Sequence, residues 1–476
     1  MKQNIVAMTV AIGMAASGSV LGAQLFDVTA FGAVGDGKTM NTASIQKAVD
    51  ACADKGGGVV LIPAGTFESG SIELKSNVTL LLSEGAVLRG SESPEDYPPN
   101  PFHHNEMGKT RSLLWAIGKS DIQITGSGII DLRDKPFMDW DQHPTDSLST
   151  GVPLNDKQKL ESTAKHIDRP TQPIFFHQCE RLRLNGVTIR NSPCWTITAS
   201  RCRDIKISGL SIENNLRAPN SDGIHFSGSK EIIVTDCVFS CGDDCIAVTG
   251  ITDWAATSEN IVISNCTMRS RSAAIRFGHM ASKVRNVVVS NLTIHDSNRG
   301  IAIFAGNDGW VKEVLISNLV INTRIIPGAW WGKGEPLVIG AAGTGRISGV
   351  SICQVRTESE NGIVIAGKDG NIRDVQLRDW VVRSRLGENR GLFKHLFDVQ
   401  PAKPIPSPDP TKHIPGIFAT GVDGLRLFNV RCSNDSETIS VEPIMSGVTG
   451  LKLVDCEFSS AGILHNSSND STTVAP

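Results

Sequence analysis

The sequence predicts an all-β fold, a single-stranded right-handed parallel β-helix (a solenoid) with a short N-terminal capping helix. Three observations support this: a strand-like motif recurs along the chain, its spacing varies little, and helical periodicity is found in one early segment. The motif reads apolar-x-apolar-x-(Gly/Asn/Asp)-apolar-x-apolar, as in LRLNGVTI at 182–189, IIVTDCVF at 232–239 and VVVSNLTI at 287–294. Repeats that bury their apolar side chains only against neighbouring repeats indicate a solenoid.

The spacing of the motif distinguishes between solenoids. The first apolar residue after the turn falls at 187, 210, 237, 266, 292 and 319, so successive copies lie 23 to 29 residues apart. β-branched residues dominate, and the leucine and asparagine spacing of a leucine-rich repeat does not occur, which favours the β-helix. We expect the polar turn residue, often Asn, to hydrogen-bond to its own copy in the next coil.

The N-terminal segments precede the repeats. Residues 42–53 carry apolar side chains at helical spacing and are followed by Gly56, Gly57 and Gly58, which predicts the capping helix. Residues 1–23 join Lys2 to an apolar run and then small residues, so we expect a signal peptide. An uncleaved anchor is the alternative. No later stretch approaches the roughly 20 apolar residues of a membrane span.

We therefore expect a catalytic β-helix over 24–463 and a disordered polar tail over 464–476, in a periplasmic or secreted monomer. The net charge of −3 over 476 residues gives no reason to expect nucleic acid or a membrane as a partner.

The eleven cysteines form an odd set. Cys237, Cys266 and Cys456 occupy equivalent repeat positions, which favours a buried column of free thiols over a disulfide framework. Cys245 with Cys266 is the first candidate for a bridge. No CxxC pair accompanies a spaced histidine pair, so neither zinc nor another metal or cofactor is predicted.

Three carboxylates stand out in the stretch 220–245. Asp222 precedes a glycine, and Asp243 and Asp244 follow one. Asp243 follows Asp222 by 21 residues, close to one coil. Parallel neighbours lie about 4.7–4.9 Å apart, which would bring the three acids to one surface spot. Adjacent strand residues face opposite sides, so Asp243 and Asp244 both pointing outward requires a bend, which Gly242 permits.

Such a cluster suits acid–base cleavage of a glycosidic bond. One carboxyl must hold a proton for the leaving oxygen while another is ionised, and crowding of like charges separates their pKa values in that way. Three long segments, 132–172, 324–346 and 385–416, interrupt the repeats and are expected to wall a groove. The segment 103–106 contains residue types that bind metals, but we expect a hydrogen-bonded groove wall there.

The chain resembles the polygalacturonases, glycoside hydrolase family 28. The specific signatures are NSDG at 220–223 and GDDC at 242–245, and SPEDYP at 93–98 and PCWTI at 193–197 also look like the family. FGAVGDG at 31–37 is shared more widely among pectin-active β-helices. The resemblance implies hydrolysis by single displacement with inversion. It implies that Asp243 is the general acid, that Asp222 and Asp244 hold and activate water, and that Asn220 orients substrate or an acid.

Two motifs of that family are missing. Its Gly-His-Gly should fall at 271–274, which reads RSAA, and its carboxylate-binding Arg-Ile-Lys at 302–304, which reads AIF. Charged hydrogen bonds that favour galacturonate are therefore lost there. The other candidate substrate-binding residues are His225, Arg276, His279, Arg299, Trp330, Trp331 and Lys333. Lys333 and Glu335, in one long loop, would reach into the groove and confer exo-action.

The expected substrate is an acidic plant-type polysaccharide or oligosaccharide, such as a rhamnogalacturonan or a decorated galacturonan. Two alternatives remain at this point. A polysaccharide lyase on the same fold would use an Arg or Lys base with calcium, and a non-catalytic carbohydrate-binding β-helix would leave the acids without a catalytic role.

Overall fold

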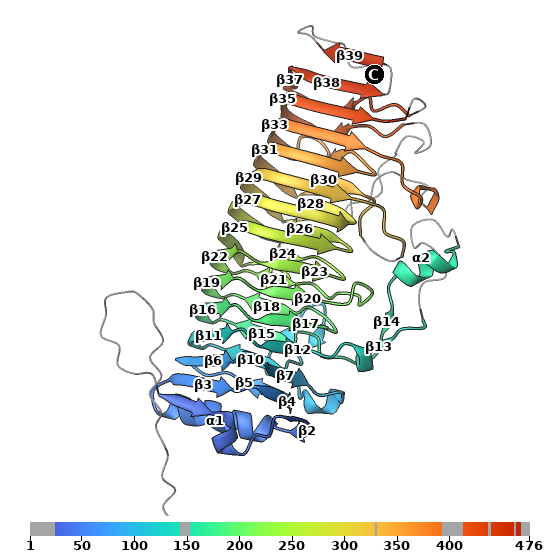
Figure 1. The fold of residues 1–476 in the computed structure, drawn as a ribbon. Helices are drawn as coiled ribbons and strands as arrows, with labels where there is room; N and C mark the ends of the chain where they lie inside the picture. Colours follow the sequence, from blue (N-terminus) through green and yellow to red (C-terminus); the bar gives the residue numbers. More distant parts are fainter. Residues whose placement is uncertain are drawn as a thin grey trace, which may run out of the picture.

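The structure, a computed structural model, describes residues 24–142, 153–328, 331–392, 413–436, 439–460 and 463–467. Parallel strands stack coil upon coil into an elongated β-helix, with the N-terminal coils at one end and the C-terminal coils at the other (Figure 1). Two sheets run the length of the stack, because every coil contributes strands to both.

Among the described residues the larger sheet has 23 strands. They are β1 (Leu25–Asp27), β2 (Asp36–Met40), β3 (Gly58–Ile62), β4 (Gly65–Ser69), β6 (Val78–Leu82), β7 (Ala86–Gly90), β11 (Ser120–Gly126), β12 (Ile129–Asp131), β16 (Glu180–Asn185), β17 (Thr188–Arg190), β19 (Arg203–Ser208), β20 (Ser211–Glu213), β22 (Lys230–Thr235), β23 (Val238–Cys241), β25 (Thr257–Ser270), β27 (Lys283–Ser297), β29 (Trp310–Thr323), β31 (Arg346–Ser359), β33 (Ile372–Ser384), β35 (Val422–Asn434), β37 (Lys452–Val454), β38 (Cys456–Ser460) and β39 (Ile463–Ser467).

The smaller sheet carries the candidate site on its outer face. Among the described residues it has 12 strands: β5 (Ile72–Glu73), β10 (Leu114–Ile117), β15 (Ile174–His177), β18 (Ile197–Ser200), β21 (Ile224–Ser227), β24 (Ile246–Thr249), β26 (Ala273–Phe277), β28 (Arg299–Ala305), β30 (Glu335–Ala341), β32 (Ile363–Ala366), β34 (Ile417–Thr420) and β36 (Ile444–Ser446). Its register aligns Thr198, His225, Ala247, Arg276 and Ala302 in one row across successive coils.

The core lies inside the coils. Strand residues alternate between buried and outward positions, as period-2 side-chain geometry requires. A continuous internal row includes Ile207, Val234, Ile263, Val289 and Ile316, each paired with the next coil. The predicted β-helix is therefore confirmed, with the repeat motif forming the larger sheet.

Helix α1 (Thr42–Asp54) closes the N-terminal end (Figure 1) and confirms the predicted capping helix to within one residue. Its buried face, Ile45, Ala48, Val49 and Cys52, packs on the first coils. At the other end β39 pairs antiparallel with β38, so residues 464–467 form a strand and the expected disordered tail does not begin at 464. Residues 1–23, the expected signal peptide, and 468–476 lie outside the described residues.

The turn position of the repeat adopts the left-handed backbone that Asn tolerates better than most residues, with φ of 55° at Asn265 and 58° at Asn291. The expected asparagine stacking is present: Asn291 Nδ2 donates to Asn265 Oδ1 at 3.1 Å, and Asn318 Nδ2 to Asn291 Oδ1 at 3.2 Å. All eleven cysteines are free, and all but Cys353 are buried. The predicted column of thiols is confirmed, and the candidate bridge between Cys245 and Cys266 is wrong.

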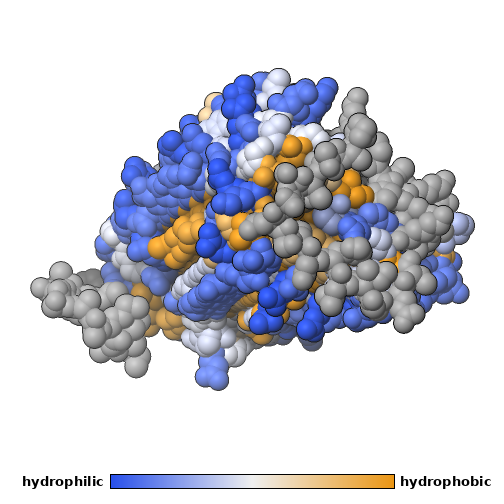
Figure 2. All heavy atoms as spheres, turned by 90° about the horizontal axis from the view of Figure 1, so that it is seen from above, coloured by the Kyte–Doolittle hydropathy of each residue, from blue (hydrophilic) through white to orange (hydrophobic). Residues whose placement is uncertain are grey.

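Short elements lie between the strands of the two large sheets: the helical turns η1 (Val28–Phe31), η2 (Pro94–Asp96), η3 (Lys135–Phe137) and η4 (Arg390–Leu392), the helix α2 (Asp156–Glu161), and the antiparallel pairs β8 (His103–His104) with β9 (Gly108–Lys109) and β13 (Met138–Asp139) with β14 (Lys165–His166). The part of the chain that the structure describes contains no helix with the length and apolar character of a membrane span. Hydrophilic residues cover most of the face in Figure 2, with apolar bands between them.

Candidate active site

The acids occupy the turns that lead into two neighbouring strands of the smaller sheet. Asp222 precedes β21, and Asp243 and Asp244 lie between β23 and β24. The two turns are hydrogen-bonded to each other, since Gly223 N–H donates to Asp244 O at 2.9 Å. A Cβ on Gly223 would lie 2.4 Å from Cys245 O, so glycine allows this close approach. The predicted gathering of the acids at adjacent coils is therefore present.

Asp222 and Asp243 both line a cavity of about 600 Å³. Asp222 is only 1% exposed, and burial together with the charges of Asp243 and Asp244 raises its pKa well above the usual value. Burial and the Asp244 charge also raise the pKa of Asp243, to about 7. Because the two carboxyls interact, they titrate as a pair, and the pair holds a proton close to neutral pH.

Asp244 differs from the other two acids. It is 1% exposed and does not line the cavity, so the expectation that it holds water beside Asp222 is not met by its position. Its Oδ1 accepts from Ala273 N–H at 2.9 Å, and its Oδ2 accepts from Arg276 Nε. Gly242 does not rotate it outward; instead its missing side chain leaves room for Ala218 O, which a Cβ would approach to 2.4 Å.

Arg276 lines the cavity from β26, as predicted. Its side chain is buried and paired with Asp244, while Nη1 makes no hydrogen bond to the described residues. Burial opposes its charge, but Asp244 and Asp222 outweigh that effect and raise its pKa, so the guanidinium stays protonated. A cation with an unused donor therefore forms part of the cavity wall beside the acids.

His279 and Trp331, also predicted, line the same wall. Their rings stack with centroids 5.7 Å apart, and Arg276 Cζ lies 5.8 Å from the Trp331 ring centroid. His279 Nε2 lies 3.4 Å from Glu106 Oε1, which ties the 103–106 segment to this wall. Burial raises the pKa of Glu106, but the hydrogen bond and charge of His279 outweigh burial and lower it. His104 Nδ1 accepts from Glu106 and Met107 N–H at 3.1 Å, so the predicted hydrogen-bonded wall is confirmed.

Asn220 lines the cavity and orients the turn of Asp222. It adopts a left-handed backbone with φ of 56°, and its Oδ1 accepts from Arg169 Nη2 at 2.9 Å. The buried Arg169 also donates to Pro193 O at 2.6 Å and to Pro219 O at 2.8 Å. One arginine of the long insertion therefore fixes the turn that carries the first acid.

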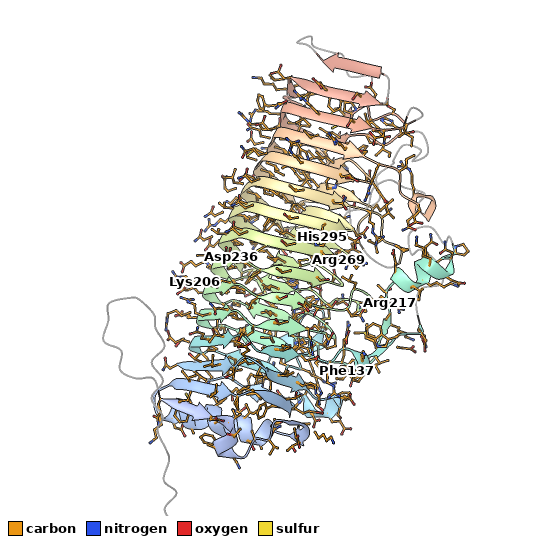
Figure 3. The ribbon with its side chains drawn as sticks, viewed as in Figure 1. Phe137, Lys206, Arg217, Asp236, Arg269 and His295 are labelled. Carbon is orange, nitrogen blue, oxygen red and sulfur yellow. The ribbon has the colours of Figure 1, made fainter. Side chains whose placement is uncertain are left out.

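The opposite wall comes from the same insertion, through Gln142, Thr163, Ala164, Lys165 and His166. Arg217 attaches this wall: its Nη2 donates to Trp140 O at 2.8 Å and its Nε to Ser162 O at 3.1 Å. Figure 3 shows Arg217 and Arg269 on the side of the solenoid toward α2, and Lys206 and Asp236 on the other side. The prediction that segment 132–172 walls a groove is confirmed for its described residues.

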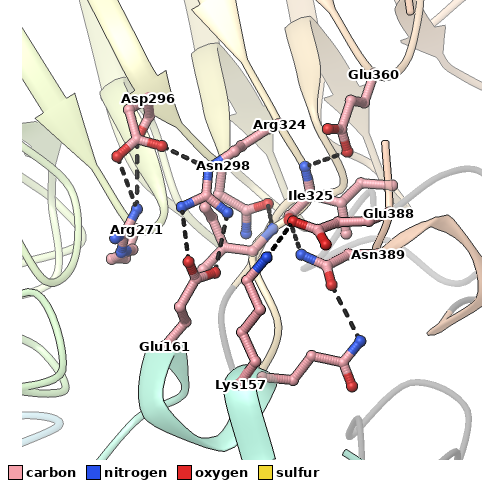
Figure 4. A network of polar contacts seen from close by, with 12 residues as sticks. Lys157, Glu161, Arg271, Asp296, Asn298, Arg324, Ile325, Glu360, Glu388 and Asn389 are labelled. Atoms are coloured by element: carbon pink, nitrogen blue, oxygen red, sulfur yellow. Dashed lines mark hydrogen bonds and ion pairs between the residues drawn. The ribbon is translucent and has the colours of Figure 1, made fainter. Parts of the chain in front are cut away.

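An ionic network, drawn in Figure 4, holds α2 against the coils. Arg324 Nη1 bonds to Glu161 Oε2 at 3.0 Å, and Arg324 also pairs with Asp296, which Arg269 and Arg271 approach as well. Glu161 is two residues from the cavity-lining Thr163. The network, here called the α2 latch (Glu161, Arg324, Asp296), therefore attaches the wall to β27 and β29.

Several predicted residues do not line the cavity. His225 is fully buried beneath Asp222, and Lys333 is also buried. Arg299 is 1% exposed, with its Nε 3.5 Å from Glu335 Oε2, so it belongs to a buried charge cluster. The expectation that Lys333 and Glu335 reach into the groove is therefore wrong. Trp330 lies outside the described residues.

The position of the missing Arg-Ile-Lys is apolar here, whereas the position of the missing Gly-His-Gly begins with the buried Arg271 and Ser272. Ala302 and Phe304 belong to a buried apolar cluster on the outer face, and Ile303 points into the core. Ala273 is buried too. No cation therefore replaces the carboxylate clamp at 302–304, and the cations near the acids come from Arg276 and the insertion.

Some lining residues were not predicted: Met107, Trp195, Pro219 and Ile251, with the insertion residues given above. Trp195 lies one coil before Asp222, since Ile197 pairs with Ile224, and this repeat spacing could have identified it. Thr196 N–H donates to Asp222 O at 3.0 Å, which fixes that register. Arg169 had no such signal, since its position depends on the path of the insertion. Among the described residues no group of three or more His, Cys, Asp or Glu is arranged to hold a metal ion.

Two protein-family models match parts of the chain. The glycosyl hydrolases family 28 model matches residues 151–384, which include the three acids, Arg169 and Arg276. Residues 151–384 thus match glycoside hydrolase family 28. A second model, rhamnogalacturonase A/epimerase, pectate lyase-like, matches residues 25–82, the capped N-terminal coils. PCWTI, NSDG and GDDC lie within the region that the family 28 model matches, FGAVGDG lies within the region of the second model, and SPEDYP lies between the two.

Two curated proteins are similar to this chain. A probable polygalacturonase of Vitis vinifera is 28% identical over 325 residues, covering 64% of this chain and 62% of the relative. An exo-poly-alpha-D-galacturonosidase of Dickeya chrysanthemi is 29% identical over 344 residues, covering 64% and 57%. The chain thus spans about three-fifths of the length of these relatives.

Solved structures share the fold. The exopolygalacturonase of Thermotoga maritima aligns with a TM-score of 0.59 and 21% identity, covering 76% of this chain and 87% of that one. The family 28 exopolygalacturonase of Yersinia enterocolitica aligns with a TM-score of 0.58 and 21% identity, covering 91% and 78%. These likenesses confirm the right-handed parallel β-helix predicted from the repeat.

Proposed function

We propose that this chain is a glycoside hydrolase of family 28 that hydrolyses glycosidic bonds in a pectin-related polysaccharide or oligosaccharide by single displacement with inversion. The observation that carries the proposal is the pairing of Asp222 and Asp243, from adjacent coils, in one cavity with raised pKa values. One proton shared by two carboxyls gives the acid and the base that this reaction needs.

The three acids have different roles in the proposed reaction. Asp243 gives its proton to the leaving oxygen, and ionised Asp222 removes a proton from the attacking water. Asp244 takes no direct part, because its two oxygens are engaged by Ala273 N–H and Arg276. Its role is to hold Arg276, whose charge limits the electrostatic cost of an ionised Asp222.

The proposed substrate is an acidic pectic saccharide. Support comes from the cationic Arg276 and Lys165 in the cavity, from the ring of Trp331 as a stacking surface for a sugar, and from the relatives named polygalacturonase and exo-poly-alpha-D-galacturonosidase. Because 302–304 lacks the Arg and Lys of the family clamp, we propose a rhamnogalacturonan or a decorated galacturonan over plain galacturonan. Exo-action is part of the proposal, and the relative named exo-poly-alpha-D-galacturonosidase supports it.

Export is part of the proposal. The charged, apolar and small-residue order of segment 1–23 supports a signal peptide and a periplasmic or secreted location. We further propose that the protein acts as a monomer, without nucleic acid or membrane as a partner.

The test is an assay on a panel of pectic polysaccharides and oligosaccharides. Reducing ends, ultraviolet absorbance and the anomeric configuration of the product by NMR are followed together. Release of inverted reducing ends without an absorbing product is expected. An unsaturated, ultraviolet-absorbing product would identify a lyase instead, and binding without turnover would identify a non-catalytic carbohydrate-binding protein.

A further inference from the structure

His225 does not line the cavity, yet its ring lies within hydrogen-bonding approach of Asp222. It is fully buried on β21, and its Nδ1 lies 3.6 Å from Asp222 Oδ2. Among the described residues Nδ1 has no hydrogen-bond partner, and neither has Asp222 Oδ1. A buried polar atom without a partner costs about 1–3 kcal/mol, so an unpaired Nδ1 facing a catalytic carboxyl calls for an explanation.

The other ring nitrogen determines which tautomer is present. His225 Nε2 lies 2.8 Å from Thr249 Oγ1. That hydroxyl accepts from Ile251 N–H at 3.4 Å, and among the described residues His225 Nε2 is the only acceptor that the proton of the hydroxyl reaches. The hydroxyl therefore donates to Nε2, which leaves the ring proton on Nδ1, directed at Asp222.

The ring is also held in its plane. Trp195 packs on His225 with ring centroids 4.0 Å apart and an angle of 34° between the planes. Strand pairing places His225 between Thr198 on one side and Ala247 on the other. With the ring fixed, a small approach of Asp222 converts the 3.6 Å contact into a hydrogen bond. Catalytic hydrogen bonds are often long in the free enzyme and tighten when substrate binds.

We propose that His225 is a positioning residue that donates Nδ1–H to ionised Asp222, so that the proton shared by the two cavity acids lies on Asp243. This inference rests on the proposed hydrolysis and goes beyond it, because neither the acid pair nor Arg276 by itself decides which carboxyl is the base. Burial alone favours the proton on Asp222, the more enclosed of the two. The histidine reverses that preference when substrate closes the gap.

The surrounding charges are compatible with this role. The groups that face Asp222 are Asp243, Asp244, Arg276 and Cys194. The groups that face His225 are Arg276, His104 and His279, and burial is the largest of the influences that lower its pKa well below the usual range. The imidazole therefore stays neutral through the working pH range, and it acts as a hydrogen-bond donor without becoming a cation.

The test separates the two ring nitrogens. In His225→Asn the amide nitrogen takes the place of Nδ1 and still reaches Asp222, whereas in His225→Gln it takes the place of Nε2 and reaches only Thr249. We expect His225→Gln to lower kcat by about tenfold and to shift the optimum to higher pH by up to about one unit, with KM unchanged. His225→Asn should retain most of kcat and the original optimum.

His177 is a matched control. It lies on β15 in the same sheet, its Nδ1 bonds to Ser200 Oγ at 3.0 Å, and it packs on Phe102 with centroids 4.4 Å apart, but it faces no catalytic acid. His177→Gln should leave the optimum of the pH profile in place. Equal effects of the Asn and Gln variants at 225, or a loss of kcat with no shift of the optimum, would reduce His225 to a packing residue.

Thr249 gives a second route if the position 225 variants fold poorly. Thr249→Val keeps the shape of the side chain and removes the hydroxyl, so the tautomer of His225 is no longer fixed. The pH optimum of this variant should shift as in His225→Gln. Thr249→Ser keeps the hydroxyl and should behave as wild type.

A further readout does not depend on activity. In wild type, ¹⁵N–¹H NMR should show the His225 ring proton on Nδ1, and Asp222→Asn should move its resonance. A ring proton on Nε2 overturns the inference even if hydrolysis is confirmed. Wild type without hydrolase activity refutes the proposed function, whatever the tautomer.

Discussion

The two cavity acids are each best tested by removing the charge and keeping the shape. Asp243→Asn and Asp222→Asn should each lower kcat by roughly 10²–10⁴, the usual contribution of a general acid or base. Because Asp243 holds its proton up to about pH 7, its loss should also remove the alkaline limb of the pH–rate profile. The measurement is kcat across pH on the substrate found in the panel; full activity in either variant contradicts the assignment.

The same carboxyl has a predictable effect on stability. The pKa of Asp243 is about 7 in the folded chain against 3.8 ordinarily, so between these values the folded state binds more protons than the unfolded state. The free energy of unfolding therefore falls as pH rises through this interval and levels off above it. Asp243→Asn should gain stability relative to wild type as the pH rises across that interval, by up to about 4 kcal/mol, because each pKa unit corresponds to about 1.4 kcal/mol. Denaturant titrations at pH 4 and pH 8 check this, and a constant difference would contradict it.

Arg276 and Asp244 form a buried pair, and removing one partner leaves the other charge uncompensated. Arg276→Met should cost about 3–5 kcal/mol in the free energy of unfolding. Adding Asp244→Asn should recover part of that loss, because the orphaned charge is then gone. A double-mutant cycle by chemical denaturation measures the coupling. Independent, additive effects would show that the pair is not the unit we describe.

At the scale of elements, the turn that carries two of the acids depends on Gly242. A Cβ there would lie 2.4 Å from Ala218 O and 2.5 Å from Ser221 Oγ. Gly242→Ala should therefore destabilise the chain by about 1–3 kcal/mol and displace the acids, lowering kcat as well. Gly391→Ala is the control, since no atom lies within 4 Å of the added Cβ there. Equal melting temperatures for the two variants would contradict the packing argument.

The α2 latch can be tested through its effect on the cavity wall that follows α2. Arg324→Gln removes the bonds to Glu161 and Asp296, and the cavity residues that follow α2 should then be held less firmly. Partly exposed ion pairs are worth roughly 0.2–1 kcal/mol, so we expect KM to rise by about two- to fivefold with kcat little changed. Lys157→Gln is the control from the same helix, because its partner Glu388 is exposed. Identical KM values for the two variants would show that the latch does not position the wall.

At the scale of the whole molecule, the repeat period alone predicted the fold. The motif has one turn position per coil, and a shift by one residue would turn every apolar side chain outward, so the register follows from the pattern. The proximity of Asp222 and Asp243 followed from the same period. What the period could not supply was the path of the insertions: Arg169 and the wall at 163–166 reach the site through contacts between distant segments.

The sequence also did not predict which outward-facing side chains of the smaller sheet line the cavity. His225 and Arg276 occupy the same row of the smaller sheet, yet one lies beneath Trp195 and the other lines the cavity. Similarly, Asp243 and Asp244 are adjacent, and only hydrogen bonds to Ala273 and Arg276 turn the second away from the cavity. These differences depend on which side chains cover each position, and the strand period contains no such information.

The buried thiols can report the order in which the coils unfold. They are distributed from α1, at Cys52, through the middle coils, at Cys179, Cys237 and Cys266, to the last coils, at Cys432 and Cys456. A solenoid opens by losing contacts between neighbouring repeats, so unwinding exposes the sulfur atoms in spatial order. Brief alkylation in rising denaturant, read peptide by peptide in a mass spectrometer, would show from which end the winding is undone.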